Sequence, residues 1–300
     1  MTVAHPPPNH EGTTRERRQF EIIASIARTD AGLMIPPEKA PMVFARITKR
    51  IRRLGLADPE EYCALVLGSE GATERRQLIS ALTTNVTGFL RERHHFDFLR
   101  QNILPDLTTR AKRGERIRIW SAGCSSGPEP YSTAMVLLDA LPDALDCDIR
   151  ILATDIDAQV LEVAQAGCYG IGQLAPLPDG YRKRFFQAAS GSGNRGDRFE
   201  VAPKLRTLIR FKELNLLAPW PMRGTFDLIF CRNVVIYFDQ DTQMDLWSRF
   251  SGACKTGGHL FLGHSERLPQ AFHVAFRPVA TTTYLRTPAT PPQHPTCKES

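Results

Sequence analysis

The chain has 300 residues, 42% of them hydrophobic, and a formal net charge of +6, enough material for one large domain or two smaller ones. It has no run of 18 apolar residues and no apolar signal segment at its polar start, so we expect a cytoplasmic protein without membrane insertion. The seven cysteines are scattered without a C-x-x-C pair, which argues against a disulfide framework or a structural zinc site.

The first part of the chain is predicted to be a small helical domain. Residues 1–14 and 287–300 are polar and rich in proline and are predicted to be disordered tails. Between residues 15 and 82, apolar residues recur at spacings of three and four, as on one face of a helix. Gly55 is expected to end a helix, and Asp58 with Pro59 to begin the next one.

The helix that precedes Gly55 also carries a basic stripe. By the same helical count, four cations lie on a face distinct from the apolar one: Arg46, Lys49, Arg50 and Arg53. A cationic face accelerates encounter with an anionic partner. The pattern alone leaves open whether that partner is nucleic acid, lipid or an acidic protein, and a solvated helix face is the alternative.

The rest of the chain is predicted to be an α/β domain. Residues 83–115 are assigned to a linker and a helix, and residues 116–286 to a domain in which four apolar strands alternate with helices: 116–120, 147–154, 226–231 and 258–262. This alternation predicts a Rossmann-like, doubly wound and mostly parallel sheet. The segment 167–207 breaks the alternation, and we expect it to form an inserted, small antiparallel β subdomain.

Two strand ends indicate a ligand site. In open parallel sheets ligands bind beyond the carboxyl ends of the strands, and here these ends carry the small-residue loop 122–127 and the acidic Asp155. The loop lacks both phosphate-binding patterns, so the pair favours an adenosine-containing ligand without phosphates, such as S-adenosylmethionine. An Asp that only caps a turn is the alternative. A G-x-G-x-x-G match at 191–196 precedes an expected strand rather than a helix, so we interpret it as a hairpin loop.

Six motifs, in the order of a known family, resemble those of CheR-type chemoreceptor glutamate methyltransferases. They lie at 83–96 (TTNVTGFLRERHHF), 120–132 (WSAGCSSGPEPYS), 153–157 (ATDID), 214–217 (LNLL), 230–238 (FCRNVVIYF) and 263–266 (GHSE). The resemblance covers about residues 20–286. One departure is Pro128, where the family usually has Glu; proline is tolerated in the first turn of a helix, so we expect the cofactor site to survive.

The resemblance implies S-adenosyl-L-methionine as cofactor, S-adenosyl-L-homocysteine as product, and a set of residues at matching positions. The implied cofactor-binding residues are Asn85, Thr87, Arg91, Glu129, Asp155, Asn215, Leu216, Arg232 and Asn233. Arg91 suits the methionine carboxylate, because a guanidinium can pair with it through two bonds. Tyr237 is expected beside the transferred methyl group, and it is assigned a catalytic role together with Arg91. The alternative, if the motifs are set aside, is that Arg91 and Arg232 are surface ion-pair residues and that Tyr237 is a core aromatic.

The implied partner is the cytoplasmic domain of methyl-accepting chemoreceptors, docked on the basic stripe. The family also implies that the β subdomain could bind a receptor C-terminal peptide by adding a strand to a sheet edge. We expect a monomer that binds no nucleic acid. We also expect no metal, since His94, His95 and His264 lack a third ligand at sensible spacing. The alternatives kept open are a methyltransferase of another substrate such as RNA, and a non-catalytic adaptor that binds S-adenosylmethionine.

Overall fold

The computed structural model describes residues 10–189 and 197–288, which form two compact units. One unit contains the chain up to Thr84 together with Tyr237–Asp239, and the other contains Asn85–Ile236 and the chain from Gln240 onward. The G-x-G-x-x-G match at 191–196 and Cys297 lie outside the described residues. Within the described residues, no helix combines the length and the apolar character that a membrane crossing requires.

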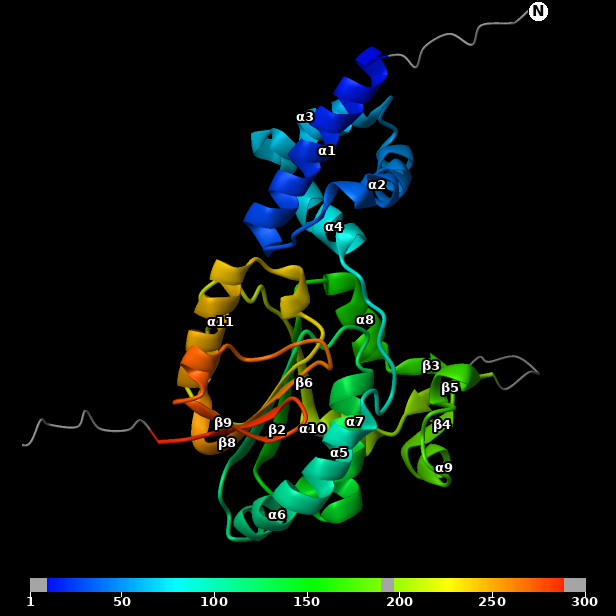
Figure 1. Cartoon of the computed structure of the whole chain (residues 1–300). Coiled ribbons are helices and arrows are strands. Elements are labelled where there is room, and N and C mark those ends of the chain that lie inside the picture. Colours follow the sequence, from blue (N-terminus) through cyan, green and yellow to red (C-terminus); the bar gives the residue numbers. More distant parts are fainter. Residues whose placement is uncertain (1–9, 190–196, 289–300) are drawn as a thin grey trace, which may run out of the picture. The chain divides into compact units, whose positions relative to one another are not determined.

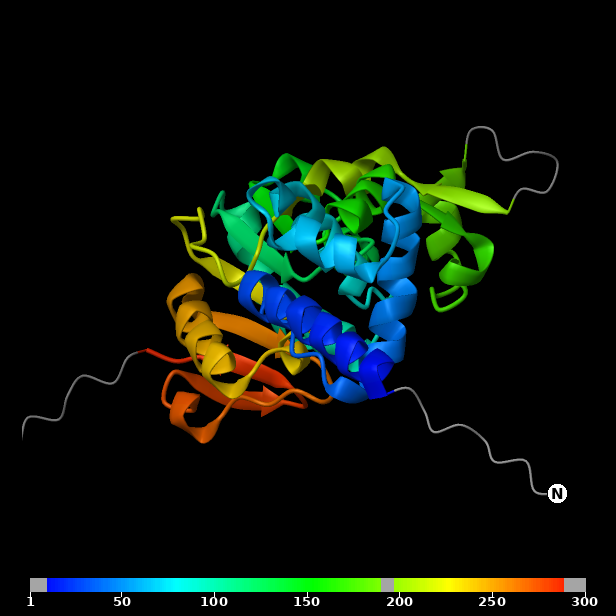
Figure 2. The same cartoon turned by 90° about the horizontal axis from the view of Figure 1, so that it is seen from above.

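The first unit is helical. Its described α-helices are α1 (His10–Ala31), α2 (Ala40–Leu54), α3 (Pro59–Leu67) and α4 (Ala72–Leu82). The long helix α1, dark blue in Figures 1 and 2, packs against α3 and α4. The helix α1 begins at His10, which is earlier than the start of the predicted helical segment 15–82. The predicted apolar stripe of α2 is buried, through Val43, Ile47 and Ile51.

The two helix boundaries predicted around residue 55 are confirmed. Gly55 follows α2 in the left-handed region, with φ 70°, and its N–H donates to carbonyls of the last turn. Asp58 precedes α3, and its carboxylate accepts hydrogen bonds from the N–H groups of Glu60 and Glu61. Pro59 occupies the first helical position, where a missing N–H costs nothing.

The second unit contains the predicted α/β sheet. The described residues form seven strands in the order β6 (Ile209–Glu213), β2 (Ile149–Asp155), β1 (Ile117–Ala122), β7 (Phe226–Cys231), β8 (Cys254–Leu262), β10 (Thr283–Arg286) and β9 (Phe276–Ala280). The first five run parallel, and β10 is antiparallel to both of its neighbours. Chain order reverses at β1, so the carboxyl ends of β1, β2 and β7 meet at the switch point where ligands bind in such sheets.

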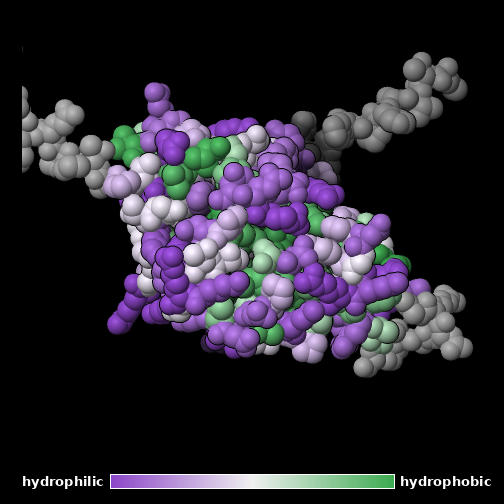
Figure 3. All heavy atoms as spheres, turned by 90° about the horizontal axis from the view of Figure 1, so that it is seen from below, coloured by the Kyte–Doolittle hydropathy of each residue, from purple (hydrophilic) through white to green (hydrophobic). Residues whose placement is uncertain are grey.

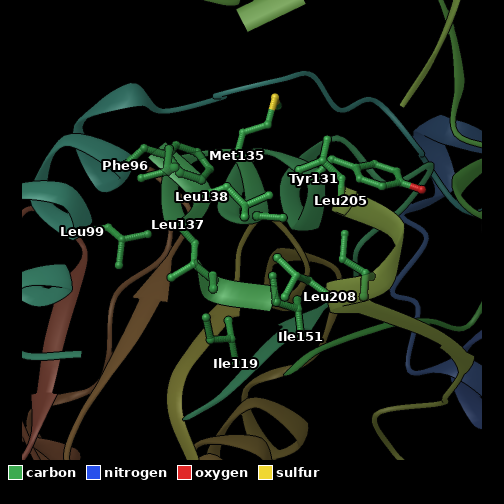
Figure 4. Packing of buried hydrophobic residues seen from close by; sticks show 14 of the residues in the cluster. Phe96, Leu99, Ile119, Tyr131, Met135, Leu137, Leu138, Ile151, Leu205 and Leu208 are labelled. Carbon is green, nitrogen blue, oxygen red and sulfur yellow. The ribbon is translucent and has the colours of Figure 1, made fainter. Parts of the chain in front are cut away.

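Helices cover both faces of this sheet. α11 (Gln240–Ala253) lies on one side, and the other side carries α5 (Arg93–Phe98), α6 (Leu104–Lys112), α7 (Pro128–Ala140), α8 (Ala158–Ala166) and α10 (Pro203–Leu208) (Figure 1). In the core, side chains of α7 such as Leu137 and Leu138 meet Ile119 and Ile151 of the sheet (Figure 4). The loop that follows β1 leads directly into α7. The packing of α7 on the sheet therefore fixes the position of this loop, called the β1 loop below.

The segment between α8 and α10 forms the inserted antiparallel sheet that the sequence predicts. Its strands pair in the order β3 (Cys168–Gly170), β5 (Arg198–Val201) and β4 (Phe186–Ala188), and α9 (Tyr181–Phe185) precedes β4. The insertion projects to one side of the main sheet in both views (Figures 1 and 2). Tyr169 of β3 joins it to the main core, because its hydroxyl donates to the carbonyl of Ser126 at 2.7 Å.

One face of the molecule, viewed from below, is mainly hydrophilic. Among the described residues visible there, apolar side chains form small groups separated by hydrophilic ones (Figure 3). Scattered apolar residues of this kind are normal on a solvent-facing surface.

Candidate active site

The loop after β1 is held in a compact shape that requires glycine. Gly123 has φ +83°, and a Cβ atom there would lie 2.3 Å from Cγ2 of Val234. The N–H groups of Gly123 and Cys124 donate to the carbonyl of Thr154 at 2.8 and 2.9 Å. The loop is thus fixed against the ends of the neighbouring strands β2 and β7, and a larger residue at Gly123 would displace it.

Asp155 ends β2 beside this loop, as predicted. Its carboxylate is buried and accepts the N–H groups of Ser125 at 2.8 Å and Asp157 at 3.0 Å. Burial raises the pKa of the Asp155 carboxyl, and the two backbone bonds oppose the rise. Asn85 joins the same cluster, because its side-chain amide donates to Asp157 at 2.8 Å and its carbonyl accepts the Ser125 hydroxyl at 3.2 Å.

Arg232 follows β7 and is the centre of a buried ion-pair cluster. Its side chain is 2% exposed and lies 3.1 Å from the carboxylate of Glu129 and 3.3 Å from that of Glu92. It also donates to the carbonyl of Arg91. Burial raises the pKa of Glu129, although Arg232 opposes this. For Glu92, burial acts in the same direction, but Arg232 and His264 outweigh it and the pKa is lowered. Arg232 is therefore no surface ion-pair residue.

Glu92 is a member of this cluster that sequence reasoning missed. It has a left-handed backbone, with φ 56°, and its carboxylate accepts the N–H of His264 at 3.2 Å. Its place beside Arg91 in the first motif was the available signal. The cluster thus joins the segments around residues 92, 129, 232 and 264, which are far apart in the sequence.

The remaining predicted cofactor residues lie in two loops. After β6, Asn215 accepts the N–H of Leu217 at 2.9 Å, and the carbonyl of the buried Leu216 accepts Trp220 Nε1 at 3.1 Å. The N–H of Leu214 donates to the carbonyl of Asp155 at 2.9 Å, so this loop lies next to the end of β2. The half-buried Thr87 belongs to the loop before α5, in which Arg91 donates to the carbonyl of Val86 at 2.8 Å.

Comparison with known proteins identifies the family. Residues 18–83 match the model described as CheR methyltransferase, all-alpha domain, and residues 85–285 match the one described as CheR methyltransferase, SAM binding domain. The chain belongs to the CheR methyltransferase family. The resemblance seen in the six motifs is confirmed, and with it the assignment of the chain as an S-adenosylmethionine-dependent methyltransferase of chemotaxis.

Named relatives agree with this CheR assignment. A probable chemotaxis protein methyltransferase of Rhizobium etli is 48% identical over 260 residues, which cover 86% of this chain and 96% of the relative. Chemotaxis protein methyltransferase 2 of Pseudomonas aeruginosa is 39% identical, with 89% and 92% covered. Among solved structures, PKMT2 from Rickettsia typhi in complex with AdoHcy is 14% identical, with a match that covers 49% of this chain and 20% of that chain at a TM-score of 0.30.

Within the CheR chain, Tyr237 belongs to the first compact unit. It ends the short 3₁₀ helix Val235–Tyr237, its side chain is half-buried, and its carbonyl accepts the N–H of Met34 at 2.7 Å. Asp239, two residues later, pairs with Arg28 at 3.1 Å. The backbone of this segment is therefore anchored to α1 and to the chain that follows it.

The basic stripe of α2 is divided between internal and exposed cations. Arg46 donates to three carbonyls at the end of α4, and Arg50 pairs with the buried Glu74 at 2.6 Å. Lys49 and Arg53 are exposed. Arg46 and Arg50 therefore have structural partners inside the unit, which the helical count could not reveal, and the cations open to a partner are Lys49 and Arg53.

A histidine cluster next to Arg232 raises the question of a metal. Ligand atoms of Glu92, His94 and His95 lie within 4.8 Å of one another, so the structure supplies the third ligand that sequence spacing lacked. However, the Arg232 guanidinium lies 3.3 Å from Glu92 and would repel a cation. Burial, aided by Arg232, lowers the pKa of His95 to about 3, and its Nε2 is 2.8 Å from the Thr282 hydroxyl. We assign His95 to packing.

Proposed function

We propose that this CheR methyltransferase esterifies glutamate side chains in the cytoplasmic domain of chemoreceptors, and that it acts in the cytoplasm. The observation that carries the proposal is the buried cluster of Glu129, Arg232 and Glu92 at the carboxyl ends of the central strands. It joins three of the motifs on which the family resemblance rests. The chemotaxis methyltransferases named above support the receptor as substrate.

The residues at these strand ends suit S-adenosylmethionine. Asp155 and Glu129 are acceptors for a ribose diol and an amino group, Arg91 is a partner for a carboxylate, and the apolar Leu216 suits an adenine ring. The compact loop at Gly123 admits close approach of a ligand to the backbone. In addition, Nε of Arg232 is buried without a protein hydrogen-bond partner among the described residues, as expected in a site that a polar ligand completes.

The proposed reaction needs alignment rather than a base. When bound, S-adenosylmethionine supplies an electrophilic methyl group on a positively charged sulfur. A glutamate side chain titrates near about 4.3 and is already ionised at neutral pH, so no residue has to remove a proton. The carboxylate oxygen gains the methyl group, the carbon–sulfur bond breaks, and S-adenosylhomocysteine leaves. Holding the reacting groups in line can contribute roughly 7–11 kcal/mol.

Two residues are proposed to provide that alignment. Tyr237 orients the substrate carboxylate, and Arg91 helps to position it. Loss of both charges in the reaction favours walls that exclude water. The buried side chains around Arg232 agree with that requirement.

Receptor recognition is proposed to begin on α2. Methylation helices of receptors carry several glutamates, and the exposed Lys49 and Arg53 offer complementary charge. The outer strands β3 and β4 of the inserted sheet are the place where a receptor C-terminal peptide would add a strand. We further propose that the enzyme is a monomer.

The test is incubation with tritiated S-adenosylmethionine and receptor-containing membranes, followed by mild alkaline hydrolysis. Release of volatile tritiated methanol from a receptor-sized band supports a glutamyl ester. Alkali-stable label would contradict the carboxylate substrate and favour another methyl acceptor such as RNA. Measurable cofactor binding with no label on any acceptor would favour a non-catalytic adaptor.

A further inference from the structure

Glu266, in the loop after β8, has its carboxylate surrounded by backbone N–H groups. The residue is 3% exposed. Oε1 accepts the N–H groups of Val234, Val235 and Ile236 at 2.9, 2.9 and 3.4 Å, and Oε2 accepts those of Asn233 and Gly263 at 2.8 and 2.6 Å. Successive N–H groups turned toward one anion form a nest, and hydrogen bonds to an ionised acceptor are stronger than those between neutral groups.

The segment held by this carboxylate has a conformation that needs such support. Asn233 has φ 58°, in the left-handed region, which is uncommon for residues other than glycine although asparagine adopts it more readily than most. The N–H groups that follow open the short 3₁₀ helix Val235–Tyr237 and have no intrahelical acceptor. Glu266 supplies that acceptor, so the carboxylate stabilises both the unusual backbone turn and the helix start.

Close packing on two sides makes the arrangement specific. A Cβ atom on Gly263 would lie 2.4 Å from Nδ2 of Asn233 and 2.8 Å from Oε2 of Glu266. On the other side, the side chain of Val234 fills the space where Gly123 lacks a Cβ. The held segment therefore lies between the end of β8 and the β1 loop, and a shift of residues 233–236 would move the loop of the candidate cofactor site.

We propose that Glu266 is a positioning residue for methyl transfer. Its carboxylate fixes the backbone of residues 233–236, and thereby the Asn233 side chain and the start of the segment that continues into Tyr237. The inference rests on the roles proposed above for Asn233 and Tyr237. Glu266 acts only through the backbone that it binds.

The first variant is Glu266→Gln, which keeps the size of the side chain but replaces one accepting oxygen with an amide donor. Backbone N–H groups on that side lose their acceptor, and the segment shifts. A misplacement of about 1 Å can lower turnover about a hundredfold, so kcat should fall about tenfold to a hundredfold. The KM for receptor should stay unchanged, because the proposed docking cations lie in the other unit. Glu266→Asp, which keeps the charge, should retain more activity than Glu266→Gln.

Asp227→Asn is the matched control. Asp227 is a buried carboxylate near the opposite end of β7, where it accepts the N–H of Arg118 at 2.8 Å and pairs with Arg110 at 2.6 Å. Its variant should lower the melting temperature and leave kcat near that of the wild type. If Glu266→Gln also only lowers the melting temperature, the positioning role is refuted. A wild type that forms no glutamyl ester would instead refute the proposed function.

Amide hydrogen exchange tests the carboxylate contacts without any assay of activity. In the wild type, the amides of residues 233–236 should exchange slowly. Three of the four precede or open a single helical turn, a position in which amides without an acceptor exchange fast. In Glu266→Gln, that protection should decrease while the strand β7 stays protected. Fast exchange of these amides in the wild type would overturn the inference, even if no variant folds.

Discussion

Replacing Arg232 by methionine should destabilise the second unit strongly, and more at neutral than at acidic pH. The guanidinium is 2% exposed, and its partners Glu129 and Glu92 are 11% and 10% exposed, so solvent screens these pairs little. Removing one partner of a buried ion pair typically costs about 3–5 kcal/mol, because the remaining charge stays buried. Here two carboxylates lose their partner, so the upper part of that range is expected.

The pH dependence follows from the two pKa shifts. Glu129 has a raised pKa in the folded protein, so its ionisation destabilises the fold as pH rises, and protonation removes that cost in acid. Glu92 has a lowered pKa, so the stability that Arg232 gives it is present at neutral pH and is lost as pH falls. In both cases Arg232 stabilises the ionised carboxylate, so its contribution disappears when the carboxylate is protonated. The difference in free energy of unfolding between wild type and Arg232→Met should therefore decrease toward acidic pH.

The assay is urea unfolding of both proteins at neutral and mildly acidic pH, with Arg116→Met as control. Arg116 is 75% exposed and lies 3.6 Å from Asp148, and such surface pairs contribute about 0–1 kcal/mol. A second variant, Glu129→Gln combined with Arg232→Met, should recover part of the loss. The reasoning fails if Arg232→Met lowers the free energy of unfolding no more than Arg116→Met does, or if the loss caused by Arg232→Met is independent of pH.

Three further outcomes are expected. Tyr237→Phe should lower turnover roughly tenfold to a hundredfold with little change in S-adenosylmethionine affinity; unchanged turnover would remove the hydroxyl from the mechanism. Asp155→Asn should weaken cofactor binding in calorimetry about tenfold to a hundredfold, given about 1.5–3 kcal/mol for a hydrogen bond to a charged group, and an unchanged Kd would refute its role. Lys49→Glu with Arg53→Glu should raise the KM for receptor up to about thirtyfold at low salt, from up to about 1 kcal/mol for each of the two exposed pairs, and the effect should shrink as salt increases. Arg17→Glu, at an exposed cation of α1, is the control for that double variant, and an equal effect there would exclude specific docking on α2.

The fold could be predicted because its signals are local. Short apolar strands alternate with helices, and residues such as Gly55 and Asp58 have conformational or hydrogen-bonding preferences that mark helix ends. The switch point follows from strand order, so Asp155 and the β1 loop could be placed without a structure. The small antiparallel sheet was indicated by the interruption of the α/β alternation.

The contacts inside the site could not be predicted in the same way. The partners of Arg232 come from distant segments, and no spacing in the sequence relates residues 92, 129 and 232. Glu92 and Asn233 have positive φ angles that depend on contacts with distant segments, such as the hydrogen bond from the Asn233 N–H to Glu266. For α2, helical periodicity groups Arg46 and Arg50 with Lys49, but it does not tell which cations a neighbouring helix covers.

The division of the chain has a consequence for domain exchange. The chain crosses from one unit to the other after Thr84, after Ile236 and after Asp239. A chimera that acquires a new helical unit by a single junction at Thr84 would keep its old Tyr237–Asp239 segment, which is bonded to Met34 and Arg28 of the original unit. Recombination between relatives should therefore preserve function best when the helical unit and the segment Tyr237–Asp239 are inherited together.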